Sequence, residues 1–421
     1  MGNAFTSLVA RRKHIMQINC LYISYDGMTD PLGQSQVIPY LIGLSKKGYR
    51  FTLISCEKKE NLTGKNKIQA ILDANNITWE PLVYTKKPPV FSTIYDIIRI
   101  KRLALQLHKK NNFSVVHCRS YIAALIGLQL KKELHIKFIF DMRGFWANER
   151  VDGKLWNLGN PLYKTIYTFF KKKEIQFLEN ADYTISLTHN AKQEILSWPT
   201  LHNNPVKIEV IPCCADLALF NKNTIDNNKL ATLKSSLNIQ QNDFILLYLG
   251  SIGTWYMLDE MMEFFNVLKQ KNTNARFLFV TKDEHERILH TAEKFGVRDS
   301  IIIRPGNRDE VPYLIRLCNY SIFFILPSYS KKASSPTKQG EIMAMGIPVV
   351  CNTKVGDTDK IVMDYNSGVL IDKFSVNAYQ IAIEKMKTPF NETQIINGAT
   401  DYFSLESGVE KYAAVYKAVL S

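Results

Sequence analysis

From residue 17 onward, the chain alternates short apolar, β-branched runs with longer segments that mix apolar and polar residues. This alternation is typical of a parallel β-sheet covered by helices, because strands buried on both faces carry apolar residues at nearly every position. We therefore predict an α/β protein. The strands expected in the first half are residues 17–24, 51–56, 77–84, 114–118, 137–141, 183–187 and 208–211.

A second series of the same kind follows the polar segment 221–229. Its expected strands are residues 244–249, 276–280, 301–304, 321–326, 348–351 and 368–371. Because a chain of 421 residues exceeds what one hydrophobic core usually serves, we predict two doubly wound domains. We expect a leader at residues 1–15, disordered or peripheral, an N-terminal domain at 16–218 and a C-terminal domain at 219–401.

The segment 334–350 is the strongest candidate for a binding site, since it follows an expected strand directly. Pro336 is suited to begin a helix whose free backbone amides face an anion. Lys338 adds a positive charge to the first turn, and Glu341 follows one turn later, where a carboxylate can accept both hydroxyls of a ribose. Ser335 and Thr337 flank the same helix start and complete this candidate set.

This segment, SSPTKQGEIMAMGIPVV, resembles glycosyltransferase family 4, whose members carry a helix of the form E-x7-E followed by AMAxGxPVV. Glu341 matches the second glutamate, whereas Ala333 stands where the family has the first. The resemblance spans nearly the whole chain and implies the GT-B architecture, in which two Rossmann-like domains face each other across a cleft. It also implies that the C-terminal helix, at 402–421, packs back on the N-terminal domain.

Three further loops are expected to contribute to the donor site. Gly250, Ser251 and Gly253 follow the strand 244–249, where glycines allow the backbone to approach a pyrophosphate closely. The family's charged residues after this loop are replaced by uncharged ones, so Lys338 is the expected source of charge. The resemblance places nucleobase contacts at Gly306, Asn307 and Arg308, and places Gly33 in a loop that faces the cleft. Core packing is the alternative for Trp255 or Tyr256.

Polar residues also follow the strands of the first half, where the carboxyl ends of parallel strands meet at one edge. They suggest an acceptor pocket, and His117 resembles the family's cleft histidine. We assign catalysis to His117 and Arg119 together with Lys338. The expected acceptor-binding residues are Asp141, Arg143, Trp146 and His189. Trp146 could instead pack in the core, and Asn190 beside His189 could be a plain helix cap.

Charge and hydropathy add one expectation about location. The net charge of +14 favours phosphates, anionic lipid or nucleic acid without choosing among them. Segments 97–110 and 163–178 combine apolar faces with lysines and arginines, which suits an anionic membrane surface, although solvated helix faces explain them equally well. No apolar run is long enough to cross a bilayer, and the scattered cysteines suit reduced thiols. We expect a cytoplasmic protein, peripheral on the inner face of the membrane.

Together with the family resemblance, which implies retention of configuration, these observations predict a transferase that moves a hexose-type sugar from a nucleotide-sugar to an envelope polysaccharide or lipid-linked glycan. The resemblance implies a UDP- or GDP-sugar as co-substrate, with no bound metal and no cofactor. The alternatives are a non-hydrolysing nucleotide-sugar epimerase and a catalytically inactive module that binds nucleotide-sugar. Nucleic acid is not an expected partner, although the charge alone would allow it. The absence of GxGxxG after either opening strand disfavours a dehydrogenase.

Overall fold

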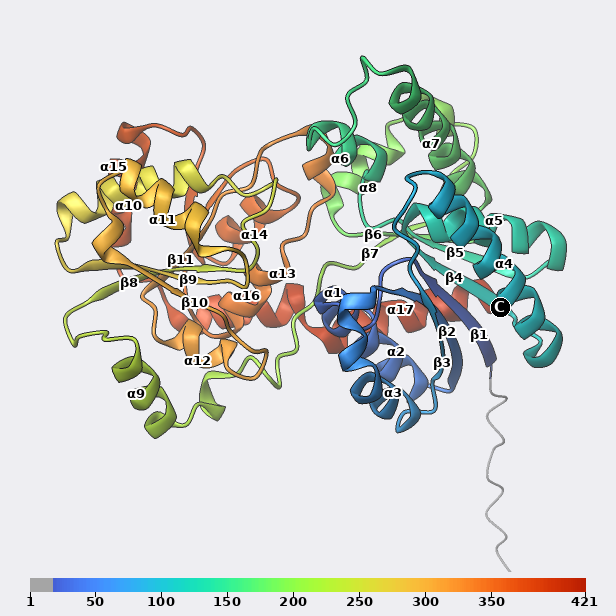
Figure 1. The fold of residues 1–421 in the computed structure, drawn as a ribbon, viewed down its shortest axis with the longest axis horizontal. Helices are drawn as coiled ribbons and strands as arrows, with labels where there is room; N and C mark the ends of the chain where they lie inside the picture. Colours follow the sequence, from blue (N-terminus) through green and yellow to red (C-terminus); the bar gives the residue numbers. More distant parts are fainter. Residues whose placement is uncertain (1–17) are drawn as a thin grey trace, which may run out of the picture.

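The computed structural model describes residues 18–421, which form two α/β domains side by side (Figure 1). The leader expected at residues 1–15 lies outside the described residues. The strands of the N-terminal domain are β1 (Ile18–Ser24), β2 (Tyr49–Glu57), β3 (Thr78–Val83), β4 (Val115–Arg119), β5 (Lys137–Asp141), β6 (Tyr183–Ser186) and β7 (Ile208–Val210). Those of the C-terminal domain are β8 (Phe244–Leu249), β9 (Ala275–Val280), β10 (Ile301–Arg304), β11 (Tyr320–Phe323), β12 (Val349–Asn352) and β13 (Gly368–Ile371).

Both sheets are parallel and doubly wound, which confirms the predicted fold class. The strand order is β3-β2-β1-β4-β5-β6-β7 in the first sheet and β10-β9-β8-β11-β12-β13 in the second. In each sheet the order reverses between two central strands, β1 and β4 or β8 and β11. Ligands bind such sheets beyond the carboxyl ends of the strands at this reversal. The loops after these four strands are therefore where a site should be sought.

Each predicted strand is present and most bounds agree within two residues, but one strand ends three residues early. The strand predicted to reach residue 326 ends at Phe323. Beyond this point the side chain of Asn352, and not a strand backbone, binds the backbone of Ile325. Its Oδ1 accepts a hydrogen bond from the Ile325 amide at 2.8 Å, and its Nδ2 donates to the Ile325 carbonyl at 2.9 Å. The chain therefore leaves the sheet before the segment that leads to Pro336.

Helices cover both faces of each sheet (Figure 1). The N-terminal domain has α1 (Pro31–Gln36), α2 (Ile38–Ser45), α3 (Lys65–Asp73), α4 (Phe91–Asn111), α5 (Ser120–Leu134), α6 (Trp146–Asp152), α7 (Pro161–Asn180) and α8 (His189–Leu196). The C-terminal domain has α9 (Asn227–Ser236), α10 (Leu258–Lys271), α11 (His285–Lys294), α12 (Val311–Arg316), α13 (Thr337–Ala344), α14 (Thr358–Asp364), α15 (Val376–Met386) and α16 (Glu392–Phe403). A short 3-10 helix, η5 (Tyr329–Ala333), precedes α13.

The last helix, α17 (Leu405–Leu420), belongs to the core of the N-terminal domain although the chain reaches it from the C-terminal domain. Figure 1 shows it, in red, beside the blue helix α2. Its buried residues Tyr412, Val415 and Tyr416 share one hydrophobic cluster with β1 and β2. The chain passes between the domains twice, near Ala215 and near Phe403. A hydrogen bond joins these two segments: the Ala215 amide donates to the Phe403 carbonyl at 2.7 Å.

Candidate functional site

Lys338, in the first turn of α13, is a buried cation without a hydrogen-bond partner among residues 18–421. It is only 8% exposed. Its Nζ lies 3.8 Å from the centre of the Tyr256 ring and 4.3 Å from that of Tyr248. Burial lowers the pKa of Lys338 to about 7. A cation that is held by aromatic faces and lacks a paired carboxylate is suited to receive an anionic ligand.

The glycine loop after β8 meets this lysine. A Cβ added at Gly250 would lie 3.3 Å from Lys338 Nζ and would crowd the ammonium, and the φ of +111° at this position also favours glycine. Asp283 holds the loop in place: its carboxylate accepts hydrogen bonds from Ser251 Oγ at 2.8 Å and from the Ile252 amide at 2.5 Å. Gly253 is exposed beyond these contacts. The structure thus brings Gly250 and Lys338 together.

Glu341, one turn along α13, is buried close to Lys338 and to Arg308. Its Oε1 lies 3.5 Å from Arg308 Nη1. Burial raises the pKa of Glu341 to about 7, and Arg308 and Lys338 oppose that shift. Arg308 follows β10, so two separate segments of the C-terminal domain, α13 and the loop after β10, contribute charge to one place. A carboxylate, a guanidinium and an ammonium in this arrangement match the groups of a ribose and a diphosphate.

The other residues predicted for the donor site have supporting positions. Gly306 packs against Val280 and Leu314, and the carbonyl of exposed Asn307 accepts hydrogen bonds that begin α12. Ser335 Oγ accepts a hydrogen bond from the Cys213 amide at 3.1 Å, which links the start of α13 to the N-terminal domain. Thr337 is half-buried at that helix start.

Gly33 allows the loop after β1 to pack closely against the start of α1. A Cβ on Gly33 would lie 2.3 Å from the Gly27 carbonyl oxygen, so the loop after β1 folds tightly onto α1. Glu57, which sequence reasoning missed, fixes this loop. Its carboxylate accepts hydrogen bonds from the amides of Met28 at 2.8 Å and Thr29 at 2.9 Å. No sequence signal marks Glu57, because it becomes important only when β2 lies beside the loop.

In the N-terminal domain, His117 lies beneath α17. It is 2% exposed, and its Nδ1 is 2.8 Å from the Tyr416 hydroxyl. Its Nε2 is 3.6 Å from Asp141 Oδ2, which also accepts a hydrogen bond from the Tyr412 hydroxyl at 3.1 Å. Burial lowers the pKa of His117, and Asp141 opposes that shift. The structure therefore holds a neutral imidazole between a helix and a carboxylate.

Two arginines adjoin this histidine. Arg119 Nε lies 3.5 Å from Asp26 Oδ2, and Arg143 Nη1 lies 3.9 Å from Asp141 Oδ1. Burial would raise the pKa of Asp141, but Arg143 and His117 reverse the effect and lower it. Arg143 Nη2 also donates to Cys213 Sγ at 3.2 Å. Because the Cys213 amide binds Ser335, Arg143 lies at the junction of the two domains.

Trp146 and His189 contribute to packing and to the domain interface. The Trp146 ring packs against Phe170 and Trp156, at centroid distances of 4.8 Å and 5.3 Å. Trp146 is half-buried and packs against the core cluster, which agrees with the alternative of packing. The His189 side chain is exposed, and its amide donates to Asp357 Oδ2 at 2.7 Å.

The interpretation of Asn190 as a plain helix cap is wrong. Thr188 caps α8, because its hydroxyl oxygen accepts a hydrogen bond from the Ala191 amide at 3.1 Å. Asn190 is the second residue of the helix. The Asn190 side chain instead donates to the Gly356 carbonyl of the other domain. The start of α8 is thus bound to the C-terminal domain.

The segment around Ala333 joins the domains as well. Ala333 is buried within the core cluster of the N-terminal domain. Lys331 Nζ lies 3.1 Å from Glu149 Oε1 and 3.6 Å from the centre of the Trp255 ring, and Lys332 pairs with Glu194 at 2.7 Å. These lysines are therefore committed to the interface at the place where family 4 carries its first glutamate.

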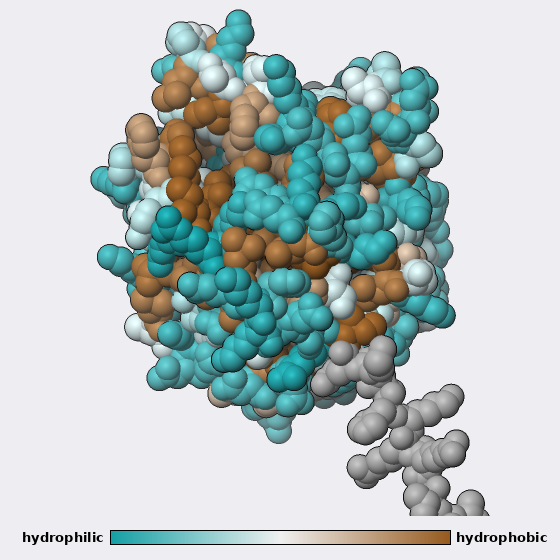
Figure 2. Space-filling view, turned by 90° about the vertical axis from the view of Figure 1, so that its right-hand side faces the viewer, coloured by the Kyte–Doolittle hydropathy of each residue, from teal (hydrophilic) through white to brown (hydrophobic). Residues whose placement is uncertain are grey.

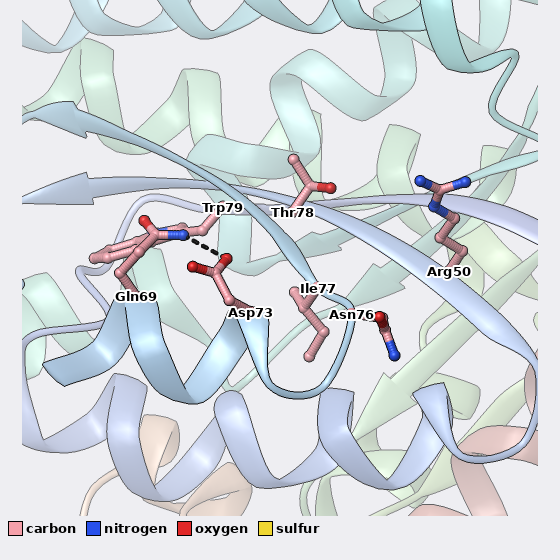
Figure 3. Close-up of a pocket in the computed structure, with 7 residues that line it drawn as sticks. All are labelled: Arg50, Gln69, Asp73, Asn76, Ile77, Thr78 and Trp79. Atoms are coloured by element: carbon pink, nitrogen blue, oxygen red, sulfur yellow. Dashed lines mark hydrogen bonds between the residues drawn. The ribbon is translucent and has the colours of Figure 1, made fainter. Parts of the chain in front are cut away.

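A separate surface cavity lies away from all of these residues. Figure 3 shows it beside the amino ends of β2 and β3, the edge of the sheet opposite to the one that carries Arg119 and Asp141. Its lining includes Arg50, Asp73 and Thr78. None of the residues predicted from the sequence contributes to it, so it is not part of the candidate site.

Comparison with known families agrees with this geometry. A model described as Glycosyltransferase Family 4 matches residues 37–219, and one described as Glycosyl transferases group 1 matches residues 231–393. The chain is a glycosyltransferase of the family 4 type. This confirms the resemblance, the enzyme class and the transfer of a sugar from a donor. The matched segments contain Lys338, Glu341 and the loops that surround them.

Individual proteins resemble this glycosyltransferase along most of its length. The D-inositol 3-phosphate glycosyltransferase of Segniliparus rotundus is 22% identical over 365 residues, covering 82% of this chain and 77% of that protein. The sucrose-phosphate synthase of Thermosynechococcus elongatus has a TM-score of 0.71 at 14% identity, over 95% of this chain and 98% of that one. HepE of Anabaena, in complex with UDP and glucose, has a TM-score of 0.67 at 12% identity, over 95% and 99%. The two structures show the shared GT-B fold.

Within residues 18–421, no helix is long and apolar enough to span a bilayer. Over the same residues, no group of three or more histidine, cysteine or acidic side chains is arranged to hold a metal ion.

Proposed function

We propose that this glycosyltransferase binds a nucleotide-sugar, with UDP- and GDP-hexoses as first candidates, and transfers the sugar with retention of configuration. Lys338 carries the proposal: it is a buried ammonium without a hydrogen-bond partner in the described chain, beside Gly250 and at the amino end of α13. UDP and glucose bound to HepE support a donor of this kind. Retention of configuration is what the family 4 resemblance implies.

The chemistry that these residues would supply is electrostatic. When the sugar leaves, negative charge develops on the nucleoside diphosphate, and preorganised positive groups stabilise that charge best where water is excluded. Lys338 and the free amides of α13 would take this role, and Glu341 would accept the ribose hydroxyls. We propose that the reaction needs no bound metal and no cofactor, because these groups meet the charge themselves.

The decisive experiment compares wild-type protein with Glu341→Ala. UDP and GDP are titrated calorimetrically, and release of the nucleoside diphosphate from UDP- and GDP-sugars is then measured with a panel of acceptors. Loss of a charged acceptor for the ribose should weaken nucleotide binding by about 2 kcal/mol. Glu286→Ala, an exposed glutamate on α11, is the matched control and should bind normally.

Two outcomes would contradict the proposal. Unchanged nucleotide affinity in Glu341→Ala would remove Glu341 from the donor site. Epimerised donor formed without any acceptor would favour the nucleotide-sugar epimerase instead. Product anomers resolved by NMR test retention, and activity unaffected by a chelator tests metal independence.

We further propose that the acceptor is an envelope polysaccharide or lipid-linked glycan, reached from the surface of an anionic membrane. The support is a patch at the start of α4, where Phe91 (72% exposed), Ile94, Tyr95 and Ile98 reach the surface. Lysines 58, 59, 86 and 87 line a cavity next to it, together with Arg99. Figure 2, which looks onto the N-terminal domain, shows hydrophobic residues at the surface among hydrophilic ones. Apolar side chains bordered by cations suit the headgroup region of an anionic bilayer.

Co-sedimentation with vesicles tests this location. The full chain should bind vesicles that contain phosphatidylglycerol more strongly than vesicles of phosphatidylcholine alone. Phe91→Ser combined with Ile94→Ser should reduce binding at least fivefold, whereas the exposed Met363→Ser on α14 of the other domain is the control. Equal binding to both kinds of vesicle, or no effect of the double substitution, would contradict membrane contact.

A further inference from the structure

Two guanidinium groups lie at the carboxyl edge of the first sheet and are not neutralised as buried charges usually are. Arg119 is the last residue of β4, and Arg143 follows β5 by two residues. Arg119 is 4% exposed, yet its Nε and Nη1 have no hydrogen-bond partner among the described residues. A buried charge without partners costs several kcal/mol, and a bound anion would supply the partners that the protein does not.

The charges around these arginines do not balance inside the protein. Asp141 is the buried carboxylate nearest to Arg143. It lies directly opposite Arg119 on the neighbouring strand, so the side chains of Asp141 and Arg119 lie on the same face of the sheet. Asp141 Oδ1 is 3.9 Å from Arg143 and also lacks a hydrogen-bond partner within the described residues. Asp26, the carboxylate nearest to Arg119, has a side chain that is half-exposed and therefore screened. One buried carboxylate thus adjoins two arginines whose side chains are only 5% and 10% exposed.

Arg119 and Arg143 lie apart from the residues that we assign to the donor site. Arg143 contacts Cys213, whose amide binds Ser335 at the start of α13. Lys338, on the other side of that junction, lies against Tyr256 and Gly250 in the C-terminal domain. The two arginines belong to the N-terminal domain, whereas Lys338 and Arg308 belong to the C-terminal domain. The acceptor is the substrate that this side of the boundary would receive.

We propose that Arg119 and Arg143 bind an oxyanion on the acceptor, so that the enzyme glycosylates an anionic sugar, either a phosphorylated sugar or a uronic acid. This inference rests on the proposed function and adds the chemical class of its acceptor. Planar guanidinium groups match phosphate and carboxylate oxygens in a bidentate way that an ammonium cannot. The bound anion would add a second negative charge beside Arg119, Arg143 and Asp141.

Calorimetric titration of the full chain tests this assignment without requiring turnover. The protein is first saturated with UDP, or with GDP if that nucleotide binds better, so that the donor site is filled. Glucose 6-phosphate, glucuronate, inorganic phosphate and uncharged glucose are then titrated separately. We expect at least one anion to bind to the nucleotide-loaded protein, and glucose to bind at least tenfold more weakly. The phosphate and glucuronate arms decide which anion is preferred.

Substitutions assign the binding to the two arginines. Arg119→Gln and Arg143→Gln should each weaken binding of the anion at least tenfold and change nucleotide affinity less than twofold. Arg50→Gln, in the cavity at the opposite sheet edge (Figure 3), is the matched control and should leave both affinities unchanged. Because Arg119→Gln removes a buried charge, its thermal midpoint should not fall below that of Arg50→Gln.

Several outcomes would overturn the inference. Anions that compete with the nucleotide would assign the arginines to the donor diphosphate. An Arg119→Gln protein that is less stable but binds anions normally would make Arg119 a structural residue. Binding of a nucleotide with no binding of any anion would refute the anionic acceptor and leave the proposed function intact, whereas failure of both UDP and GDP to bind would count against the proposed function.

Discussion

At the scale of single residues, the site is built from charges that folding alone does not favour. Lys338 and Glu341 are both buried, and burial moves the pKa of each to about 7 from opposite directions. Neither shift can be read from the sequence, because burial is the main cause of both and depends on how distant segments pack. The residue types and their spacing could be predicted; their burial could not.

Lys338→Met should stabilise the protein in the absence of ligand. The folded-state pKa of Lys338 is about 7, against an ordinary value of 10.5, so the unfolded chain binds more protons between these values. The cost of the buried charge is therefore complete below about pH 7 and declines as the pH rises toward 10.5. At pH 6 we expect the free energy of unfolding of the variant to be higher than that of the wild type by an amount on the order of 2 kcal/mol. This difference should disappear as the pH approaches 10.5.

Urea denaturation across this pH range measures the effect, with the exposed Lys282→Met as control. Added UDP or GDP should reverse the ranking, because the wild-type ammonium then has an anionic partner. Equal stability of variant and wild type at pH 6 would mean that the ammonium is solvated in the folded state.

At the scale of elements, the thirteen strands follow from local patterns, but the place of α17 does not. A helix with buried Tyr412, Val415 and Tyr416 needs an apolar surface, and its sequence is compatible with either domain. It lies on the N-terminal sheet because the Tyr416 hydroxyl meets His117 there and because α2 covers its other side. The pattern of a helix specifies which face is buried and leaves open what buries it.

Truncating Tyr416 measures how far α17 supports the N-terminal domain. Tyr416→Phe removes only the hydrogen bond to His117 and should cost about 1 kcal/mol of unfolding free energy. Tyr416→Ala also leaves a cavity and should cost roughly 3–5 kcal/mol. The exposed Lys417→Ala, on the same helix, should have almost no effect in the same denaturation experiment. Similar values for Tyr416→Ala and Lys417→Ala would show that α17 is not part of the core.

At the scale of the whole molecule, the domains are held together by polar contacts around the starts of α8, α13 and α14. Asp357 lies at their centre: its carboxylate accepts hydrogen bonds from the amides of His189 at 2.7 Å and Asn190 at 3.0 Å, and from the Tyr402 hydroxyl at 2.5 Å. Polar interfaces of this kind between domains commonly open and close during a reaction. In the structure these contacts join the two domains, with the proposed donor residues on one side and the proposed acceptor residues on the other.

Asp357→Ala should loosen this arrangement without disturbing the donor residues. We expect small-angle scattering to report a larger radius of gyration, and the rate of sugar transfer to fall about tenfold, or roughly 1.4 kcal/mol. Nucleotide affinity should stay unchanged because Lys338 and Glu341 are untouched. Asp364→Ala, whose side chain pairs with Lys360 on the surface of α14, is the control. An unchanged radius together with an unchanged rate would show that Asp357 does not hold the domains together.

Short-range patterns were enough to predict the strands, the two doubly wound sheets and the candidate segment from Ser335 to Glu341. Those features depend on the periodicity of apolar residues and on helix-start chemistry, which act over short distances along the chain. Tertiary structure decided the rest. It packed the half-buried Trp146 against the core, placed His117 under α17 and left Arg119 Nε and Nη1 without a hydrogen bond in the described chain. These outcomes depend on which residues lie opposite one another, and a contact between distant segments leaves no pattern in either segment alone.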